Sequence, residues 1–285
     1  MHTMKLGILA LFLIAGLGTA RGAGPARIRV VSQTVGTDEL LLAVAAPGQI
    51  AALSHLATDP QFCAVAEEAR AYPQLQLNGD AESVIKFSPT LVLCADYSRP
   101  ELVAQIRRAG VEVLVFDRYL SLGDAYANLR VLAGRLGTGR RAEELIAGCQ
   151  ARVGELRARL EGVRKVRVIA PSTYGLLPGA GTTFQDLCDN SGAENLAFTL
   201  GRLSGHAPQP SEQMLDWPVD FVVVSGGEPG AALAPFRAIP PYEYMAAVKE
   251  GRAVLLPPYA LGCVSHYRIR AYEIMARALH PEAFR

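Results

Sequence analysis

Seven side chains of types that bind metals or polar groups follow apolar runs of the sequence. Histidine and tyrosine can ligate iron, arginine can hold a carboxylate through two hydrogen bonds, and tyrosine combines an apolar ring with a polar end. Open α/β sheets leave a crevice at the carboxyl ends of their strands, so side chains in the loops after strands are expected to meet there. Any one of them also fits a surface role, so the sequence predicts a binding region. The predicted ligand-binding residues are His55, Tyr97, Arg118, Tyr119, Tyr174, Tyr259 and His266.

Two glutamates occupy matching places in two similar stretches. Residues 78–93 (NGDAESVIKFSPTLVL) carry Glu82, and residues 209–227 (QPSEQMLDWPVDFVVVSGG) carry Glu212; each lies near the start of a short predicted helix that precedes an apolar strand. This pseudo-repeat predicts two similar α/β lobes that each present one acidic residue, which suits docking onto a partner. The alternative is that each glutamate only stabilises the N-terminus of its helix through the helix dipole.

Length and charge limit the possible functions. A chain of 285 residues, half of them hydrophobic, is long enough for two modest domains with separate cores. The formal net charge is +1, from 28 Lys and Arg against 27 Asp and Glu. Such a balance provides no strong field for nucleic acid or anionic lipid, so nucleic acid is not an expected partner.

The first 23 residues have the three-part pattern of a secretory signal peptide. Lys5 precedes an apolar run over 6–17, and small residues follow as far as Ala23. The run is short for a membrane span, although a permanent N-terminal anchor remains the alternative. No cysteine stands near the cleavage region, so lipid attachment is not expected. The mature protein is therefore predicted to be exported to the periplasm.

Export makes the five cysteines possible disulfide partners. Cys94 lies in an apolar strand and Cys149 on the apolar face of a helix, which favours a role as small buried hydrophobes. At least one of the five thiols stays unpaired within a monomer; Cys188 and Cys263 fall in the same half of the chain and could pair, which the sequence alone does not settle. Their spacing matches no zinc-binding pattern, and no intrinsic metal or cofactor is expected.

Apolar, β-branched runs alternate with helical patterns through both halves of the chain. Helices are predicted over 60–71 and 99–108, and this alternation is typical of parallel sheets covered by helices. The fold class is therefore α/β, with an N-terminal lobe (24–138) and a C-terminal lobe (164–285), each with a central, mostly parallel sheet flanked by helices. The predicted strands are 28–31, 91–94, 111–116, 166–170, 221–225 and 253–256.

One long helix is predicted to join the lobes within residues 139–163. Apolar residues from Ala142 to Leu160 recur at alternating steps of four and three, which indicates a single amphipathic helix over 140–161. At 1.5 Å per residue such a helix reaches roughly 33 Å, enough to brace both lobes. The apolar seam is short for a coiled coil and lies between globular halves, so that alternative is disfavoured.

Several segments together resemble one family. Residues 27–54 (RIRVVSQTVGTDELLLAVAAPGQIAALS), 81–93 (AESVIKFSPTLVL), the bracing helix, 192–197 (GAENLA) and 211–227 look like the helical-backbone periplasmic binding proteins. Those proteins are the substrate-binding subunits of ATP-driven importers for cobalamin, haem and iron siderophores. The resemblance implies that this chain captures a metal chelate in the cleft between its lobes, as a monomer, and delivers it to an ABC permease and its ATPase.

The resemblance also gives the two glutamates a role. In the family a glutamate seven residues before the proline of the next strand meets an arginine of the permease, one in each lobe. Glu82 stands seven residues before Pro89, with Thr90 in place of the usual aspartate. Glu212 has the equivalent place, although Val219 replaces the proline. Such pairs set orientation and association rate more than affinity.

The sequence leaves the chelate open. The segment LPPYALGCVSHYR (256–268) lacks the acidic side chains of cobalamin-binding members, and the single tryptophan, Trp217, is expected in the core. A haem site would need a ligand from each lobe, for which Tyr97 with His266 is one of several possibilities. A siderophore site would instead use Arg118 and Tyr119.

No pattern for catalysis stands out. The glycine-rich segment 175–187 (GLLPGAGTTFQDL) lacks the spacing of a phosphate-binding loop and is predicted to be a lid or hinge loop. Ser172 has no nucleophile elbow, and paired catalytic acids are missing. A binding protein is therefore favoured, and an exported two-lobed α/β enzyme such as a transferase is the alternative, since fold does not fix function.

Overall fold

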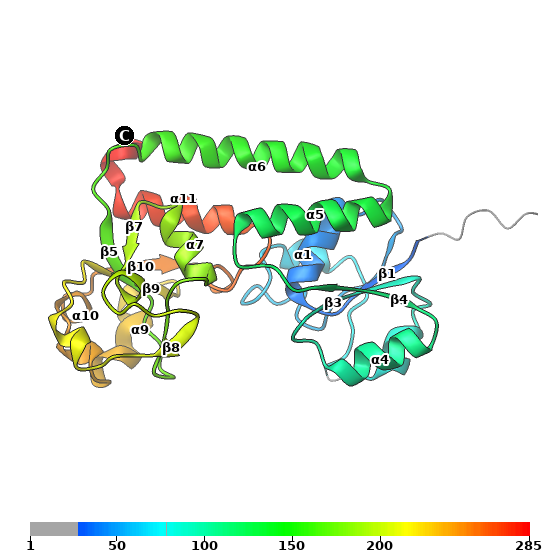
Figure 1. The fold of residues 1–285 in the computed structure, drawn as a ribbon, viewed down its shortest axis with the longest axis horizontal. Helices are drawn as coiled ribbons and strands as arrows, with labels where there is room; N and C mark the ends of the chain where they lie inside the picture. The colour runs from blue at the N-terminus through cyan, green and yellow to red at the C-terminus, as the bar shows by residue number, and fades with distance from the viewer. Residues whose placement is uncertain (1–27, 78) are drawn as a thin grey trace, which may run out of the picture.

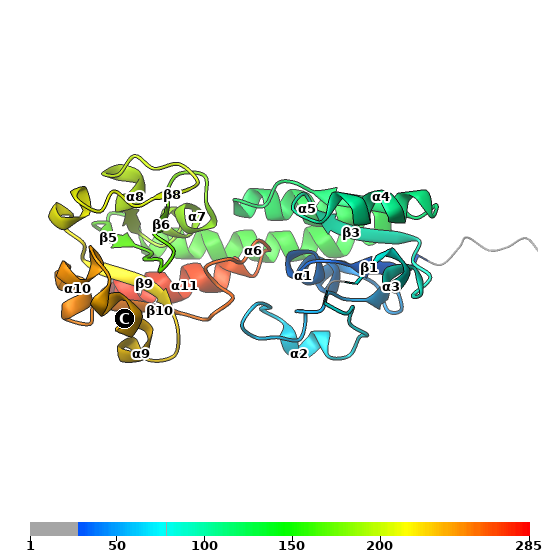
Figure 2. The same cartoon turned by 90° about the horizontal axis from the view of Figure 1, so that it is seen from below.

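Two α/β lobes lie side by side beneath one long helix, as Figure 1 shows from the side and Figure 2 from below. The computed structural model describes residues 28–77 and 79–285, and the predicted leader (1–23) lies outside the described residues. The predicted fold class is confirmed: each lobe has a four-stranded parallel sheet covered by helices. Within the described residues, no helix has both the length and the apolar character needed to cross a membrane.

The N-terminal lobe contains the sheet β2-β1-β3-β4, in which every pair is parallel. Its central strand β3 is buried along its whole length, which explains the continuous apolar run LVLCA. The strands are β1 (Val30–Ser32), β2 (Ile50–Ala52), β3 (Leu91–Ala95) and β4 (Glu112–Phe116). The helices are α1 (Val35–Val44), α2 (Ala66–Ala69), α3 (Ala81–Ile85), α4 (Pro100–Arg108) and α5 (Leu122–Leu136).

The C-terminal lobe contains the parallel sheet β10-β9-β5-β7 and a short antiparallel pair, β6-β8. The strands are β5 (Val166–Ile169), β6 (Leu176–Pro178), β7 (Ala193–Asn195), β8 (His206–Pro208), β9 (Phe221–Ser225) and β10 (Ala253–Leu256). The α-helices are α7 (Thr183–Asp189), α8 (Leu196–Thr199), α9 (Pro229–Leu233), α10 (Ala246–Lys249) and α11 (Arg268–Leu279). Short 3₁₀ helices are η1 (Gln213–Asp216), η2 (Ala234–Ala238), η3 (Tyr242–Tyr244) and η4 (Pro281–Phe284).

The bracing helix is α6 (Gly139–Arg159), which extends above both lobes with α5 below one half and α11 below the other (Figure 1). Its inward-facing residues Ala142, Ile146, Cys149, Val153 and Leu156 are buried in a core that includes residues of both lobes. Charged side chains fix its ends. The guanidinium of Arg141 donates to the carbonyls of Ala43 and Ala45, and Arg152 forms a two-bond ion pair with Glu273 on α11. The helix thus connects the two lobes through packing and polar contacts.

Two sequence-based expectations need correction. The first is the helix over 60–71, of which only α2 is helical. The carbonyl of Asp59 accepts hydrogen bonds from Phe62 and Cys63 in turns, and the backbone N–H of Ala64 donates to Glu39 instead of continuing a helix. A tertiary contact therefore overrides the local pattern.

The second concerns the glycine-rich segment 175–187, which is not a free lid. It forms strand β6 and then α7, whose N-cap Thr182 accepts from the N–H of Gln185. A Cβ at Gly179 would lie 2.1 Å from the carbonyl oxygen of Leu203, so glycine permits two backbone segments to touch.

Cys188 and Cys263, whose pairing the sequence left open, are not bonded to each other. All five cysteines are free and buried. Cys94 and Cys149 have the buried positions expected from the sequence, and Trp217 is also buried in a core cluster.

Candidate functional site

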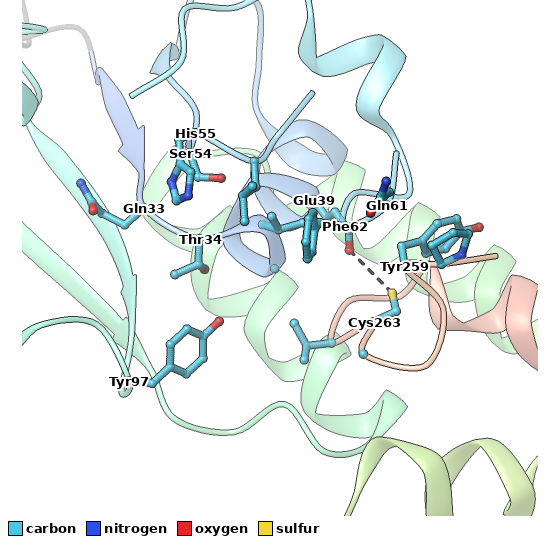
Figure 3. A pocket seen from close by; sticks show the side chains of 16 residues that line it. Gln33, Thr34, Glu39, Ser54, His55, Gln61, Phe62, Tyr97, Tyr259 and Cys263 are labelled. Carbon is cyan, nitrogen blue, oxygen red and sulfur yellow. Dashed lines mark hydrogen bonds between the residues drawn. The ribbon is translucent and has the colours of Figure 1, made fainter. Parts of the chain in front are cut away.

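A cavity of about 490 Å³ lies between the lobes, and its lining comes from both of them. The N-lobe wall consists of residues 33–36, Glu39, 54–56, 61–62 and Tyr97, at or after the carboxyl ends of β1, β2 and β3. The opposite side is the interlobe loop (257–267), which follows β10 and contributes Tyr259 and Cys263. In Figure 3 these side chains surround one space, with the Tyr97 ring on one side and Phe62 and Tyr259 on the other. This is the crevice at strand ends that parallel sheets create.

The start of α1 forms the floor of the cavity. Thr34 caps this helix, because its hydroxyl accepts from the N–H of Thr37 at 3.3 Å and the Thr37 hydroxyl accepts in return from the N–H of Thr34 at 3.2 Å. Gly36 touches the interlobe loop so closely that a Cβ would lie 2.3 Å from Cγ2 of Val264. A side chain at Gly36 would therefore push the loop away from the N-lobe wall.

Asp38, which is fully buried on α1, fixes the loop that carries His55. Its Oδ1 accepts from the N–H of Ser54 at 3.0 Å, and its Oδ2 accepts from the Ser54 hydroxyl. Burial raises the pKa of Asp38 to about 6, although the hydrogen bonds from serine oppose that rise. A carboxylate inside the helix thus positions the neighbouring ligand-binding loop.

Glu39, the next residue, links the two lobes. Its Oε1 accepts from the N–H of Ala64 at 2.7 Å, and its Oε2 accepts from the hydroxyl of Ser265 in the interlobe loop. The thiol of Cys263 also lies 3.7 Å from Oε2 (Figure 3). Burial raises the pKa of Glu39, and burial beside Glu39 raises the pKa of Cys263, so this thiol keeps its proton.

A second link between the lobes is made by Arg268, at the start of α11. Its buried guanidinium donates to the carbonyls of Tyr119 and Leu120 at 2.7 and 2.9 Å and pairs with Asp186 at 2.9 Å. The interlobe loop belongs to the C-terminal lobe by sequence, yet Glu39 and Arg268 hold its end against the N-terminal lobe. The geometry of the cavity is therefore largely preformed.

A second cavity, of about 310 Å³, lies on the C-terminal side and shares the interlobe loop through Leu261. We call its lining the C-lobe wall; it includes Ala170–Ser172, Tyr174, Leu176, Pro178, Thr183, Phe184, His206 and Leu261. Most of these side chains are apolar. The hydroxyl of Thr183 donates to the carbonyl of Leu261 at 2.9 Å, which places the loop between the two cavities.

The structure brings most of the predicted ligand-binding residues to these cavities. His55, Tyr97 and Tyr259 line the first cavity, and Tyr174, which is highly exposed, lines the second. Tyr119 lies beside Tyr97 on a narrow side pocket, where the two rings meet edge to face with centroids 6.0 Å apart.

Two predicted residues lie elsewhere. The side chain of Arg118 is 76% exposed and pairs with Asp124 at 3.0 Å. His266 is buried and packs against the ring of Tyr267, and burial lowers its pKa to about 4. Neither residue lines the three cavities that contain the other five. The burial of His266 could not be inferred from the local sequence.

Sequence reasoning missed several residues of the N-lobe wall. Gln33 and Thr34 directly follow β1, so the strand-end rule that selected Tyr97 would also have selected them. Glu39 lies inside the apolar pattern DELLLAV, where no local signal marks it as a cavity residue. Among the described residues, no group of three or more His, Cys, Asp or Glu is arranged to hold a metal ion.

The two glutamates of the pseudo-repeat are both exposed. Glu82 is in the first turn of α3, and Glu212 is the N-cap residue of η1. The side chain of Glu212 makes no capping hydrogen bond, and Asp80 rather than Glu82 caps α3. Neither glutamate lines the cavities described above.

Comparison with known sequences decides the family. The profile of the periplasmic binding protein family matches residues 30–260, most of the chain. The chain belongs to this family. The family resemblance inferred from the sequence is therefore confirmed, and it implies a periplasmic location. A comparison with curated proteins gives no match.

Solved structures share the fold at low sequence identity. The periplasmic heme-binding protein RhuT from Roseiflexus sp. RS-1 has a TM-score of 0.77 and 22% identity, over 90% of this chain and 99% of that one. A periplasmic heme-binding protein from Pseudomonas aeruginosa has a TM-score of 0.74 and 21% identity, over 89% and 92%. HutB of Vibrio cholerae, also titled a heme-binding protein, has a TM-score of 0.73 and 20% identity, over 90% and 100%. At these identities the likeness establishes the two-lobed architecture.

Proposed function

We propose that this protein is the substrate-binding component of an ABC importer and captures a metal chelate in the interlobe cleft. The observation that carries the proposal is the 490 Å³ cavity lined by both lobes at the carboxyl ends of their strands. Its size is within the range of about 300–1,000 Å³ that is usual for small-molecule sites. The structural neighbours titled as heme-binding proteins support a chelate, of the haem, siderophore or cobalamin type, as the kind of ligand.

The ligand contacts in this proposal come from the aromatic and polar residues of the first cavity. His55, Tyr97 and Tyr259 face the ligand there, Tyr174 extends the contact along the C-lobe wall, and Tyr119 supports Tyr97. Because Glu39 and Arg268 tie the interlobe loop to the N-terminal lobe, ligand capture requires only modest closure of the lobes.

Titration calorimetry of the purified protein tests this function. We expect at least one of haem, cobalamin and a set of ferric siderophores to bind with micromolar or tighter affinity and one-to-one stoichiometry. Absence of binding to every chelate, together with turnover of a small substrate, would favour the exported enzyme instead.

Delivery to the permease is proposed to depend on Glu82 and Glu212. Both carboxylates are exposed and lie outside the cavities, so charge reversal should leave ligand affinity intact. We expect the variant with Glu82→Lys and Glu212→Lys to lose uptake in cells that carry the partner permease and ATPase. A double variant that loses ligand affinity and uptake equally would contradict this role.

Export and oligomeric state complete the proposal. Residues 1–23 would act as the signal peptide, and the mature protein would work as a monomer in the periplasm. N-terminal sequencing of the exported protein, which should begin close to residue 24, and light scattering check these two points.

A further inference from the structure

Among the described residues, the cavities between the lobes are lined by no lysine or arginine, and the basic side chains that line them are the imidazoles of His55 and His206. The arginines on neighbouring segments bind partners outside the cavities. Arg118 is mostly exposed and pairs with Asp124, and Arg268 is buried against Asp186 and two carbonyls. An anionic ligand in the cleft would therefore lose its hydration without gaining a lysine or arginine partner from the cavity lining.

Acidic groups, in contrast, lie in and around the first cavity. Glu39 lines it, and Asp38 is buried directly beneath the loop that carries His55. At the side pocket, the hydroxyl of Tyr119 donates to Asp96 at 2.9 Å. These carboxylates make the cleft unfavourable for a second negative charge, because like charges at an interface repel.

Tyr97 presents a phenol hydroxyl to the first cavity, whereas the hydroxyl of Tyr119 already donates to Asp96. Burial and the nearby carboxylate of Asp96 raise the pKa of Tyr119 to about 12, and burial also raises the pKa of Tyr97. Both phenols therefore keep their protons at neutral pH. In Figure 3 the Tyr97 ring projects into the cavity with its hydroxyl toward Thr34.

An amide group adds a further donor. Gln61 stands at the exposed edge of the first cavity, where its side-chain NH2 can donate to a ligand atom that accepts. Carbonyl and hydroxamate oxygens accept hydrogen bonds without carrying a full negative charge into the cleft.

We propose that the cleft selects an uncharged or cationic metal chelate whose rim carries carbonyl or hydroxamate oxygens, and that it discriminates against chelates with free carboxylates or catecholates. This inference rests on the proposed function and narrows its ligand class. The chelate lies with its oxygen-rich rim on the N-lobe wall and its apolar part toward Leu261 and Phe184.

Titration calorimetry with a matched panel tests the selection. The panel contains an uncharged ferric trihydroxamate, a ferric trihydroxamate that bears an ammonium group, cyanocobalamin, a trianionic ferric tris-catecholate, and haem with its two propionates. We expect at least one uncharged or cationic chelate to bind about 100-fold more tightly than either anionic one, because the cleft offers the anions no lysine or arginine partner.

A cationic side chain added to the cavity should reduce the difference in affinity between the uncharged and the anionic chelates. Gln61 is exposed at the cavity edge, and only its backbone N–H bonds to Asp59, so Gln61→Arg leaves that contact in place. We expect Gln61→Arg to improve binding of the tris-catecholate roughly tenfold relative to the uncharged chelate. The control is Gln105→Arg on the exposed side of α4, which should leave the ratio of the affinities for these two chelates unchanged.

The outcomes separate the two proposals. If haem or the tris-catecholate binds most tightly to the unmodified protein, the charge selection is wrong while the binding function stands. If no member of the panel binds, the proposed function fails and the selection fails with it. If Gln61→Arg and Gln105→Arg change the affinity ratio of tris-catecholate to uncharged chelate equally, the change comes from the net charge of the protein. That result would overturn the role proposed for the cavity lining.

Discussion

The two walls of the cleft are held in place by different forces. The N-lobe wall and the interlobe loop depend on buried charged groups: Asp38 positions Ser54, Glu39 binds Ser265, and Arg268 holds two carbonyls and Asp186. The C-lobe wall consists mostly of apolar side chains that pack beside α7 and β6. Hydrogen bonds are directional and packing is not, so we expect the first wall to set the orientation of a bound ligand and the second to supply contact area.

Removing Arg268 should have the largest effect on this arrangement. The side chain is 3% exposed, and Arg268→Met would remove the cationic partner of Asp186 and the donor to two carbonyls. Asp186 would be left with hydrogen bonds from Tyr272 and the N–H of Leu122. Loss of one member of a buried ion pair costs about 3–5 kcal/mol, so chemical denaturation should show a fall of that size in the free energy of unfolding. The control is the neighbouring Arg270→Met. Because Arg270 is exposed, the free energy of unfolding of this variant should fall by less than about 1 kcal/mol. Equal losses in both variants would refute the special role of Arg268.

The buried carboxylate of Asp38 should make stability depend on pH. Its folded-state pKa is raised from 3.8 to about 6, so its contribution is fully present below pH 3.8 and is lost as the pH rises through 6. Asp38→Asn removes the titration but keeps an oxygen that can accept from Ser54. We expect the unfolding free energy of Asp38→Asn minus that of the unmodified protein to increase by about 2.4 kcal/mol between pH 4 and pH 7. A constant difference over that range would contradict the raised pKa.

Shortening an apolar side chain of the C-lobe wall should weaken binding to an intermediate degree. Leu261 lines the second cavity, and its only polar contact, to Thr183, uses its backbone carbonyl. Leu261→Ala should therefore reduce the affinity for the chelate roughly tenfold through lost apolar contact. Leu200→Ala, at an exposed position outside the cavities, is the control. If both variants bind like the unmodified protein, the C-lobe wall does not contact the ligand.

The smallest effect is expected for a single hydroxyl of the N-lobe wall. Tyr97→Phe keeps the ring that faces the cavity and removes one hydrogen-bond donor. The loss should be about 1 kcal/mol, or roughly fivefold in the dissociation constant measured by calorimetry. Tyr244→Phe, on an exposed tyrosine of η3 outside the cavities, should have no effect. An unchanged affinity for Tyr97→Phe would remove this hydroxyl from the set of ligand contacts.

The fold was largely predictable because its main elements follow regular patterns. The buried strand Leu91–Ala95 reads as a continuous apolar run, and the spacing from Ala142 to Leu156 predicts α6 to within two residues at its C-terminal end. Residues 60–65 and the glycine-rich segment were misread because their conformation depends on distant partners, Glu39 and Leu203. Such contacts leave no trace in local periodicity.

The site was predictable only where it follows the strand-end rule. That rule selected His55, Tyr97 and Tyr259, which do line the first cavity. The rule also selected His266, whose side chain is buried within the interlobe loop and does not line the cavity. Glu39 could not be predicted as a cavity residue, because an acidic residue in an amphipathic helix usually faces water. In the structure Glu39 is buried and accepts a hydrogen bond from Ser265 of the other lobe.

Anomalous diffraction from crystals of the protein saturated with its tightest-binding chelate tests the central claim most directly, because it locates the metal without reference to any ligand geometry. A single metal peak in the cleft, between Tyr97 of the N-lobe wall and Tyr259 of the interlobe loop, is the predicted result. A peak on the outer surface of either lobe, with the cleft left empty of metal, would contradict the account.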